Sequence, residues 1–258
     1  MEERKNRGPL VLLTDFGYSH YVGILKGVIL SYNPDTLIVD LTHSITPFKV
    51  VEASYALYTS YKYFPKGSIF LAVVDPGVGT ERDILITEYK DYIFIAPDNG
   101  LLSPFLDEGK NFKFTSFDRL GEISNTFHGR DVFAPIAALI STGESPKDIG
   151  TVKKNPVKIE WWRPEKIDQN TYQGIILFID RFNNAITNIP CDYINKIDKI
   201  RIKGIIIKDK FPSFGHAPYD TPFIYCGSSK FIEIGLREEG FAKKYDITLL
   251  SPLLCFIK

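Results

Sequence analysis

The sequence lacks the features that mark membrane proteins, disulfide-rich proteins and nucleic-acid binders. Its 258 residues include only three cysteines and one methionine, and no apolar run approaches the length that spans a bilayer. The 31 basic residues balance the 31 acidic ones, so the formal charge is zero and we expect no nucleic-acid partner. The charged N-terminal stretch has no signal-type apolar core. We therefore expect a cytoplasmic protein with no membrane partner.

Cysteine and histidine show no pattern of a structural or metal site. The cysteines are odd in number and widely spaced, at Cys191, Cys226 and Cys255. Such a set argues against a disulfide scaffold and for a reducing compartment. The histidines are equally scattered, at His20, His43, His128 and His216. Neither residue type occurs at zinc-site spacing and no HExxH motif is present, so we expect no metal site.

Several common enzyme motifs are absent as well. There is no glycine-rich dinucleotide motif and no P-loop, so a standard site for nucleotide phosphates is not expected. A GxSxG nucleophile elbow is also missing. Glutamine is scarce, whereas lysine, glutamate and isoleucine are plentiful. This composition fits a thermophilic source, and an AT-rich genome would bias it in the same way.

The first part of the chain alternates between strand-like and helix-like segments. The expected strands cover 10–15, 36–41 and 69–74. The expected helices between and after them cover 21–32, 50–64 and 131–140. A hairpin-type pair lies at 84–87 and 92–96. The strand–helix–strand order predicts an N-terminal α/β domain, residues 1–160, with a mainly parallel sheet.

The pattern changes after residue 143, where glycine, proline, serine and lysine become frequent. The apolar runs that follow are short and alternating, at 172–179, 200–207, 223–226, 231–234 and 246–250. Short strands at this spacing, with turn residues between them, are typical of small all-β domains. We therefore expect a smaller C-terminal β-barrel-like domain, residues 161–258.

Polar residues stand where the expected strands and helices end. Asp75 follows a buried strand, and a Pro-Gly turn leads from it to Arg82. Open α/β sheets bind ligands at such strand ends, so the two residues are candidates for an active site. They could equally form an exposed ion pair, or Asp75 could cap the turn. His128 precedes a helix, and by itself it is more simply a helix-start histidine.

Three further polar segments are candidates for ligand binding. Asp15, at the end of the first strand, could accept hydrogen bonds from a ribose or could cap a turn. The run from Asp180 to Asn184 includes the aromatic Phe182 and could hold an ammonium group, a ring and an adenine edge, or form a polar hairpin loop. The turn 227–229 offers backbone donors and is a weak signal by itself.

Five motifs in fixed order resemble the S-adenosyl-L-methionine (SAM) hydrolases, also called SAM hydroxide adenosyltransferases and formerly a domain of unknown function. Fluorinase and chlorinase are relatives of that family. The resemblance covers nearly the whole chain. The motifs are LLTDFG at 12–17, VDPGVG at 74–79, APDNG at 96–100, FHGRD at 127–131 and IDRFNN at 179–184.

This resemblance implies a fold, a reaction and a set of residues. The family hydrolyses SAM to adenosine and L-methionine, with water attacking C5′ of the ribose and SAM as substrate rather than cofactor. Members are homotrimers whose substrate lies between the N-terminal domain of one subunit and the C-terminal domain of the next. The catalytic set falls on Asp75, Arg82 and His128. The substrate-binding residues fall on Asp15, Asp180, Phe182, Asn184, Ser228 and Ser229.

Some details depart from the family or leave choices open. Many relatives have Asn-Ser where this chain has Gly227-Ser228, and glycine where it has Lys230. The halide-using relatives have no Asp-Pro-Gly turn at the Asp75 position, so water is the expected nucleophile here. A halide-using enzyme and a non-catalytic SAM or adenosine binder are the alternatives. Either Asp75 or His128 could be the base, because the pKa of arginine is too high.

Overall fold

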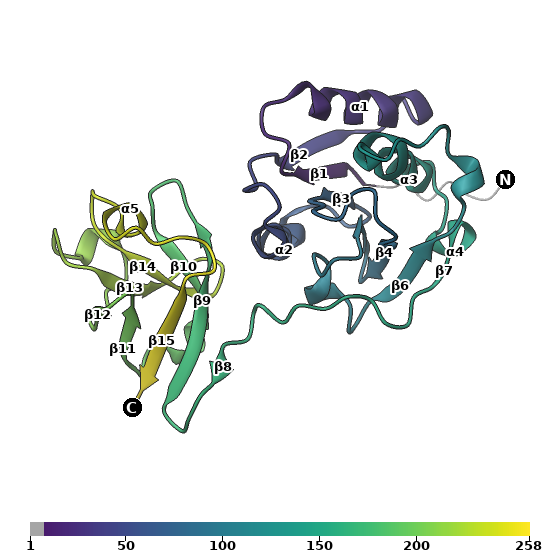
Figure 1. Cartoon of the computed structure of the whole chain (residues 1–258). Coiled ribbons are helices and arrows are strands. Elements are labelled where there is room, and N and C mark those ends of the chain that lie inside the picture. The colour runs from purple at the N-terminus through teal and green to yellow at the C-terminus, as the bar shows by residue number, and fades with distance from the viewer. Residues whose placement is uncertain (1–7) are drawn as a thin grey trace. The chain divides into compact units, whose positions relative to one another are not determined.

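The computed structural model describes residues 8–258, and the chain divides into two compact units (Figure 1). The first unit is Met1–Ile159 and the second is Glu160–Lys258. Each unit has its own sheet and its own apolar core.

The first unit contains a seven-stranded sheet in the order β2-β1-β3-β5-β4-β6-β7. Its strands are β1 (Leu10–Thr14), β2 (Ile38–Thr42), β3 (Ile69–Val73), β4 (Ile84–Tyr89), β5 (Tyr92–Pro97), β6 (Lys110–Phe114) and β7 (Gly150–Val152). Its longer helices are α1 (His20–Tyr32), α2 (Val50–Ser60) and α3 (Ala134–Ser141), and α4 (Pro146–Ile149) is a single turn.

This sheet is mixed rather than mainly parallel. The neighbours β1–β2, β1–β3 and β3–β5 are parallel, as the alternation of strands and helices predicts. The pairs β4–β5, β4–β6 and β6–β7 are antiparallel. The hairpin expected at 84–97 causes the change, because its short turn reverses the chain and places β4 on the far side of β5. The expectation of a mainly parallel sheet therefore holds for only half of it.

The sheet lies between two layers of helix because its strands are apolar on both faces. Leu10 and Leu12 of β1 pack with the buried residues of α1 and α3, whereas Val11 and Leu13 pack with those of α2. Alternate side chains of a strand point to opposite faces, so one continuous apolar run serves both layers. Figure 1 shows α1 and α3 together over one face and α2 over the other.

Two of the expected helices differ in detail. The segment expected as one helix over 50–64 is α2 followed by a 3₁₀ turn, Tyr61–Tyr63, before Pro65. The helix expected from residue 131 begins with a π-helical turn, Gly129–Phe133, that continues into α3. Such π turns are frequent at functional sites. This one directly follows His128.

The second unit is a barrel-like antiparallel sheet in the order β12-β11-β15-β9-β10-β14-β13, with β8 paired to β9. Its strands are β8 (Glu165–Lys166), β9 (Thr171–Ile179), β10 (Ala185–Pro190), β11 (Ile197–Ile202), β12 (Ile205–Ile207), β13 (Phe223–Cys226), β14 (Phe231–Gly235) and β15 (Pro252–Ile257). One helical turn, α5 (Phe241–Lys244), accompanies them. A parallel bridge from Lys210 to Ile224 brings the segment after β12 beside β13, so the sheet nearly closes.

Two expectations for this unit were wrong in detail. The run 200–207 is not one strand but β11 and β12, separated by the turn at Lys203 and Gly204, both with positive φ. The run 246–250 is a turn, because Asp246 and Leu250 also have positive φ, and the last strand begins at Pro252. Positive φ values interrupt an extended strand but leave no mark on the hydrophobic pattern.

The cysteine count did not predict the one disulfide among the described residues. Cys191 and Cys226 form a disulfide, and Cys255 is the free, buried cysteine. Cys191 directly follows β10 and Cys226 ends β13, and both strands pair with β14. The order of strands thus brings together two cysteines that are 35 residues apart. The argument from cysteine usage to a reducing compartment therefore does not hold.

We expect this disulfide to stabilise the second unit by about 2–4 kcal/mol, because it closes a loop in the unfolded chain. The Cys191→Ser/Cys226→Ser variant should unfold at lower denaturant concentration than the oxidised protein, measured by urea titration with circular dichroism. The reductant TCEP should shift the wild-type transition and leave that of the double variant in place. Equal transitions for oxidised and reduced wild-type protein would contradict the expectation.

Candidate active site

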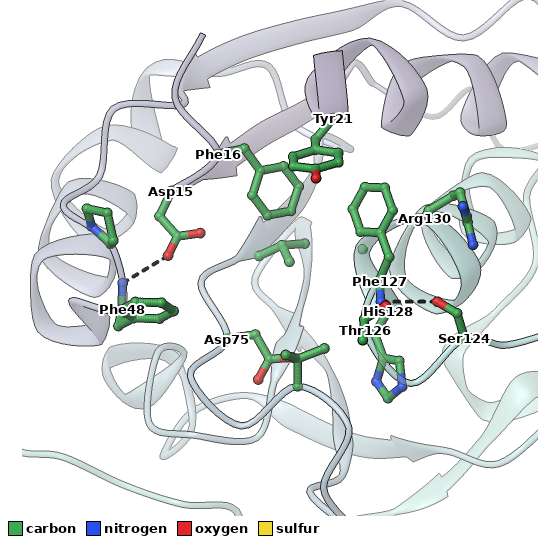
Figure 2. Close-up of a pocket in the computed structure, with 14 residues that line it drawn as sticks. Asp15, Phe16, Tyr21, Phe48, Asp75, Ser124, Thr126, Phe127, His128 and Arg130 are labelled. Atoms are coloured by element: carbon green, nitrogen blue, oxygen red, sulfur yellow. Dashed lines mark hydrogen bonds between the residues drawn. The ribbon is translucent and has the colours of Figure 1, made fainter. Parts of the chain in front are cut away.

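A pocket of about 620 Å³ opens in the first unit beside the ends of β1 and β3. Asp15 follows β1 and Asp75 follows β3 by two residues, and the two strands are parallel neighbours in which Thr14 pairs with Val73. Both carboxylates therefore leave the same edge of the sheet. Figure 2 shows them in the pocket with His128, which comes from the loop before the π turn.

Asp75, Arg82 and His128 form one hydrogen-bonded set. Arg82 Nε lies 2.7 Å from Asp75 Oδ1 and 2.8 Å from Oδ2, and Arg82 Nη2 also donates to Oδ2. The same Nη2 lies 3.0 Å from His128 Nδ1. The side chains of Asp75 and Arg82 are only 7% and 9% exposed. Their charges are therefore poorly screened by water, and the ion pair is held rigidly.

The turn between Asp75 and Arg82 shapes this set. Gly77 N donates to Asp75 Oδ1 at 3.2 Å, so the carboxylate also caps its own turn. Gly79 has a φ of 80°, and a Cβ there would lie 2.7 Å from the carbonyl oxygen of Asn125. Only glycine fits this close approach. Asp75 therefore caps the turn, as one alternative predicted, and its ion pair with Arg82 is nearly buried rather than exposed.

The contact with Arg82 fixes the proton on His128. A guanidinium has only donors, so His128 Nδ1 must accept and the neutral ring carries its proton on Nε2. Burial lowers the pKa of His128, and the charge of Arg82 lowers it further, while Asp75 and Asp131 act in the opposite direction. His128 is consequently neutral at pH 7 and acts as an acceptor for Arg82.

Asp15 faces the pocket from a partly buried position. Burial raises the pKa of its carboxyl, the backbone N–H of Phe48 opposes this shift, and the charge of Asp75 adds to it. Phe48 N donates to Asp15 Oδ2 at 2.9 Å, as the dashed line in Figure 2 shows. The second carboxylate oxygen remains available for a ligand hydroxyl.

Aromatic side chains, which the sequence analysis did not single out, form the apolar wall of the pocket. Phe16, Tyr21 and Phe127 meet edge to face, with ring centroids 5.0–6.3 Å apart. Phe48 also lines the pocket and is 66% exposed, with a φ of 68°. A flat, exposed ring beside a carboxylate suits a ligand that combines a ring with hydroxyl groups. The positive φ that presents Phe48 has no sequence signal.

The loop that carries His128 is braced by an ion pair. Arg130 Nε lies 2.5 Å from Asp131 Oδ1. This hydrogen bond lowers the pKa of Asp131 to about 2, against the opposing effect of burial. Asp131 Oδ2 accepts from Ser124 N at 3.0 Å, and Ser124 Oγ accepts from Phe127 N at 3.1 Å. The FHGRD motif thus combines His128 with the residues that fix its loop.

A second pocket, of about 670 Å³, lies in the second unit and is lined by Phe182 and Asn184. Phe182 is 76% exposed, whereas Asn184 is buried. Asp180 accepts hydrogen bonds from the backbone N–H groups of Phe182 and Asn184 and from Asn184 Nδ2, at 2.7–2.9 Å. It therefore organises the loop and does not itself line this pocket. Asn184 Oδ1 is buried with no hydrogen-bond partner among residues 8–258.

The serine turn sits beside the disulfide, outside the lining of that second pocket. Ser228 is exposed, and Ser229 Oγ is buried without a partner among the described residues. A Cβ on Gly227 would lie 1.8 Å from Glu233 Oε1, so the glycine makes room for this carboxylate. Lys230 has a φ of 69°, the backbone conformation that a glycine adopts without strain.

No group of three or more His, Cys, Asp or Glu residues among 8–258 could hold a metal ion. No helix in this part of the chain is long and apolar enough to cross a membrane.

Residues 10–150 match the family model of the SAM hydroxide adenosyltransferase N-terminal domain, and residues 174–253 match that of its C-terminal domain. The chain belongs to the SAM hydroxide adenosyltransferase family. An "(R)-S-adenosyl-L-methionine hydrolase" from Methanocaldococcus jannaschii is 34% identical over 262 residues, 95% of this chain and 94% of that protein. One from Thermus thermophilus is 33% identical over 243 residues, 89% and 92% of the two chains.

More distant family relatives and solved structures agree with this assignment. A fluorinase from Actinoplanes is 24% identical over 290 residues, 94% of this chain and 95% of that protein. The crystal structure of an uncharacterized conserved protein from Thermotoga maritima has a TM-score of 0.85 at 30% identity and covers 96% of this chain and 99% of that one. This chain and that solved protein therefore share one fold.

The electrostatics of the Asp75–Arg82–His128 set can be tested by titration. Arg82→Gln should raise the pKa of His128 because it removes a nearby positive charge, and Asp75→Asn should lower it because it removes a negative one. In the wild type this pKa should lie below the ordinary value of about 6.5. Histidine NMR signals measured against pH report all three values. Shifts of the same sign in both variants would contradict this arrangement.

Proposed function

We propose that this protein hydrolyses SAM to adenosine and L-methionine. The observation that carries the proposal is the hydrogen-bonded set of Asp75, Arg82 and His128, in a chain of the SAM hydroxide adenosyltransferase family. Asp75 and His128 line the pocket, and the nearly buried Arg82 lies behind them. A non-catalytic binder would need the ligand contacts but not this set. The names of the relatives in Methanocaldococcus and Thermus support the same reaction.

In this reaction the leaving group needs no activation, whereas the nucleophile does. The oxygen of water attacks C5′ of the ribose, and the C5′–S bond breaks with its electron pair going to sulfur. The sulfonium becomes the neutral thioether of methionine, so no acid is needed there. Water itself is a weak nucleophile at neutral pH, so the site has to accept its proton and stabilise the developing hydroxide.

Asp75 is the base in this proposal. The Nδ1 lone pair of His128 is occupied by Arg82 and its Nε2 carries a proton, so the neutral ring has no free acceptor. Asp75 lines the pocket. Its Oδ1 accepts from both Arg82 and Gly77 N, whereas Oδ2 accepts from Arg82 alone, so Oδ2 is the oxygen that takes the proton of water. Asp75 takes the proton of the attacking water and passes it to solvent. Arg82 stabilises the negative charge, and His128 orients Arg82.

The remaining site residues bind the substrate. Asp15 accepts hydrogen bonds from the ribose hydroxyls and holds C5′ in line with the water, and Phe48 packs against a ring of the substrate. Phe182 and Asn184 pack against and recognise the adenine. Asp180 provides negative charge for the methionine ammonium while it holds the loop, and Ser228 and Ser229 form a turn near the substrate.

We further propose a homotrimer in which the first unit of one subunit and the second unit of another share each substrate. The catalytic set and the adenine pocket belong to different units, which the shared site would bring together. The closed symmetry of a trimer would give three identical sites. The substrate is a small molecule in this proposal, and no cofactor takes part.

We expect SAM to yield adenosine and methionine, and reaction in ¹⁸O-labelled water should place the label in the 5′-hydroxyl of adenosine. Arg82→Gln and Asp75→Asn should each lower kcat by about 10²–10³, because each removes a group that stabilises the transition state. Chromatography with mass spectrometry measures the product and its label, and calorimetry should show that both variants still bind SAM.

The exposed Asp91→Asn variant is the matched control for Asp75→Asn and should keep wild-type activity, because Asp91 pairs with Lys66 on the surface. Unlabelled adenosine would overturn the role of water. Formation of 5′-chloro-5′-deoxyadenosine in preference to adenosine when chloride is added would support the halide alternative.

Co-expression tests the shared site. Asp75→Asn and Asp180→Ala should each inactivate the enzyme when expressed alone, the first through its catalytic unit and the second through its binding loop. Mixed trimers should regain activity, because some sites then combine two intact units from different subunits. Activity no higher than the sum of the two variants alone would show that each substrate is bound within one chain.

A further inference from the structure

The turn that carries Asp15 is clamped by the segment after β2. Gly17 N donates to the carbonyl oxygen of His43 at 2.7 Å, and Phe48 N of the same segment donates to the Asp15 carboxylate. Beneath the turn, Thr14 Oγ1 lies 2.8 Å from His43 Nδ1 and accepts from Phe16 N at 3.2 Å. We infer that His43 is a positioning residue that orients Asp15 through the hydroxyl of Thr14.

The groups around His43 fix the direction of these hydrogen bonds. His43 Nε2 lies 3.1 Å from Asp40 Oδ1, in a contact that is bent away from ideal hydrogen-bond geometry and is mainly electrostatic. A carboxylate only accepts, so the tautomer that suits Asp40 has its proton on Nε2, and in this tautomer Nδ1 is an acceptor. The Thr14 hydroxyl therefore donates to His43, which leaves its lone pairs free to accept from Phe16 N.

The series of polar contacts from Thr14 through His43 to Asp40 ends at the positive charge of a lysine. Lys26 Nζ, from α1, lies 2.6 Å from Asp40 Oδ2. Burial acts to raise the pKa of Asp40, but the interactions with Lys26 and His43 outweigh it and lower the pKa. Asp40 is therefore ionised at neutral pH and keeps the His43 proton on Nε2. These polar contacts therefore connect α1, through β2, with the turn at the end of β1.

Thr14 acts through its neighbour, because its side chain is fully buried and cannot touch a ligand. A buried hydroxyl that lost its acceptor would cost free energy, so the Thr14–His43 bond holds the start of the turn in one conformation. The carboxylate of the next residue, Asp15, is thereby presented to the pocket in a fixed direction. The inference rests on the proposed role of Asp15 in binding the ribose.

Substitutions of Thr14 separate the hydroxyl from the packing. Thr14→Val keeps the shape but removes the hydrogen bonds, and we expect it to bind adenosine roughly tenfold more weakly. Thr14→Ser keeps the hydroxyl and should restore most of the affinity. The control is Thr36→Val, which removes a hydroxyl contact with Ser141 near the opposite end of β2 and should bind adenosine like the wild type. Calorimetry measures each dissociation constant.

Two results would overturn the inference from these variants. Thr14→Val with wild-type affinity would show that the hydroxyl does not orient Asp15. Thr14→Ser as weak as Thr14→Val would assign the effect to the methyl group and its packing. Because adenosine binding needs no turnover, a protein that binds adenosine but fails to hydrolyse SAM would refute the proposed reaction and leave this test intact.

The tautomer of His43 gives a second test that needs no ligand. The chain has four histidines, so ¹⁵N-histidine labelling gives few signals, and His43→Gln and His128→Gln assign two of them. We expect His43 with a protonated Nε2 and an unprotonated Nδ1 at pH 7, in wild type and in Asp91→Asn alike. A proton on Nδ1, or rapid averaging of the two tautomers, would overturn the inferred direction of the hydrogen bonds.

Discussion

The site of the first unit depends on one constraint: a nearly buried ion pair must have its hydrogen bonds satisfied by the protein. Asp75 and Arg82 are less than a tenth exposed, and burying either charge alone would be strongly destabilising. The Asp-Pro-Gly turn supplies a backbone donor to Asp75, and His128 accepts from Arg82. The contacts that satisfy the hydrogen bonds of this buried ion pair also determine which nitrogen of His128 carries the proton. Stability and the division of chemical roles thus have one physical origin.

The parallel half of the sheet places Asp75, whereas Arg82 comes from the loop between β3 and β4. The parallel pairing of β1 and β3 puts Asp15 and Asp75 at one edge, where their charges influence each other. The antiparallel half contributes packing rather than pocket residues. Asn99, which follows β5, donates to the carbonyl oxygen of Val74 and steadies the residue before Asp75. A mixed sheet therefore serves the site as well as a parallel one.

The second unit stabilises its loops by different means. Asp180 holds the loop 180–184 through three hydrogen bonds, and the disulfide from Cys191 to Cys226 ties down the chain just before the serine turn. The loops of an antiparallel barrel lie at the surface, where water competes for the hydrogen bonds of their backbone groups. Asn184 Oδ1 and Ser229 Oγ, which belong to these two loops, are buried and have no hydrogen-bond partner among residues 8–258.

The sequence alone determined the two-part architecture of the fold, because hydrophobic periodicity reports local burial. Its ordered motifs indicated the family, and they identified Asp15, Asp75, Arg82 and His128 as candidate site residues. It could not determine the mixed sheet, since strand order depends on long-range pairing, nor the disulfide, whose cysteines meet only through β14. The position of Phe48 in the pocket and the Thr14–His43 hydrogen bond could not be predicted from the sequence for the same reason. The hydrogen bonds of His43 with Thr14 and of His128 with Arg82 join segments that are distant in the sequence, and these contacts decided which nitrogen of each of the two histidines carries the proton.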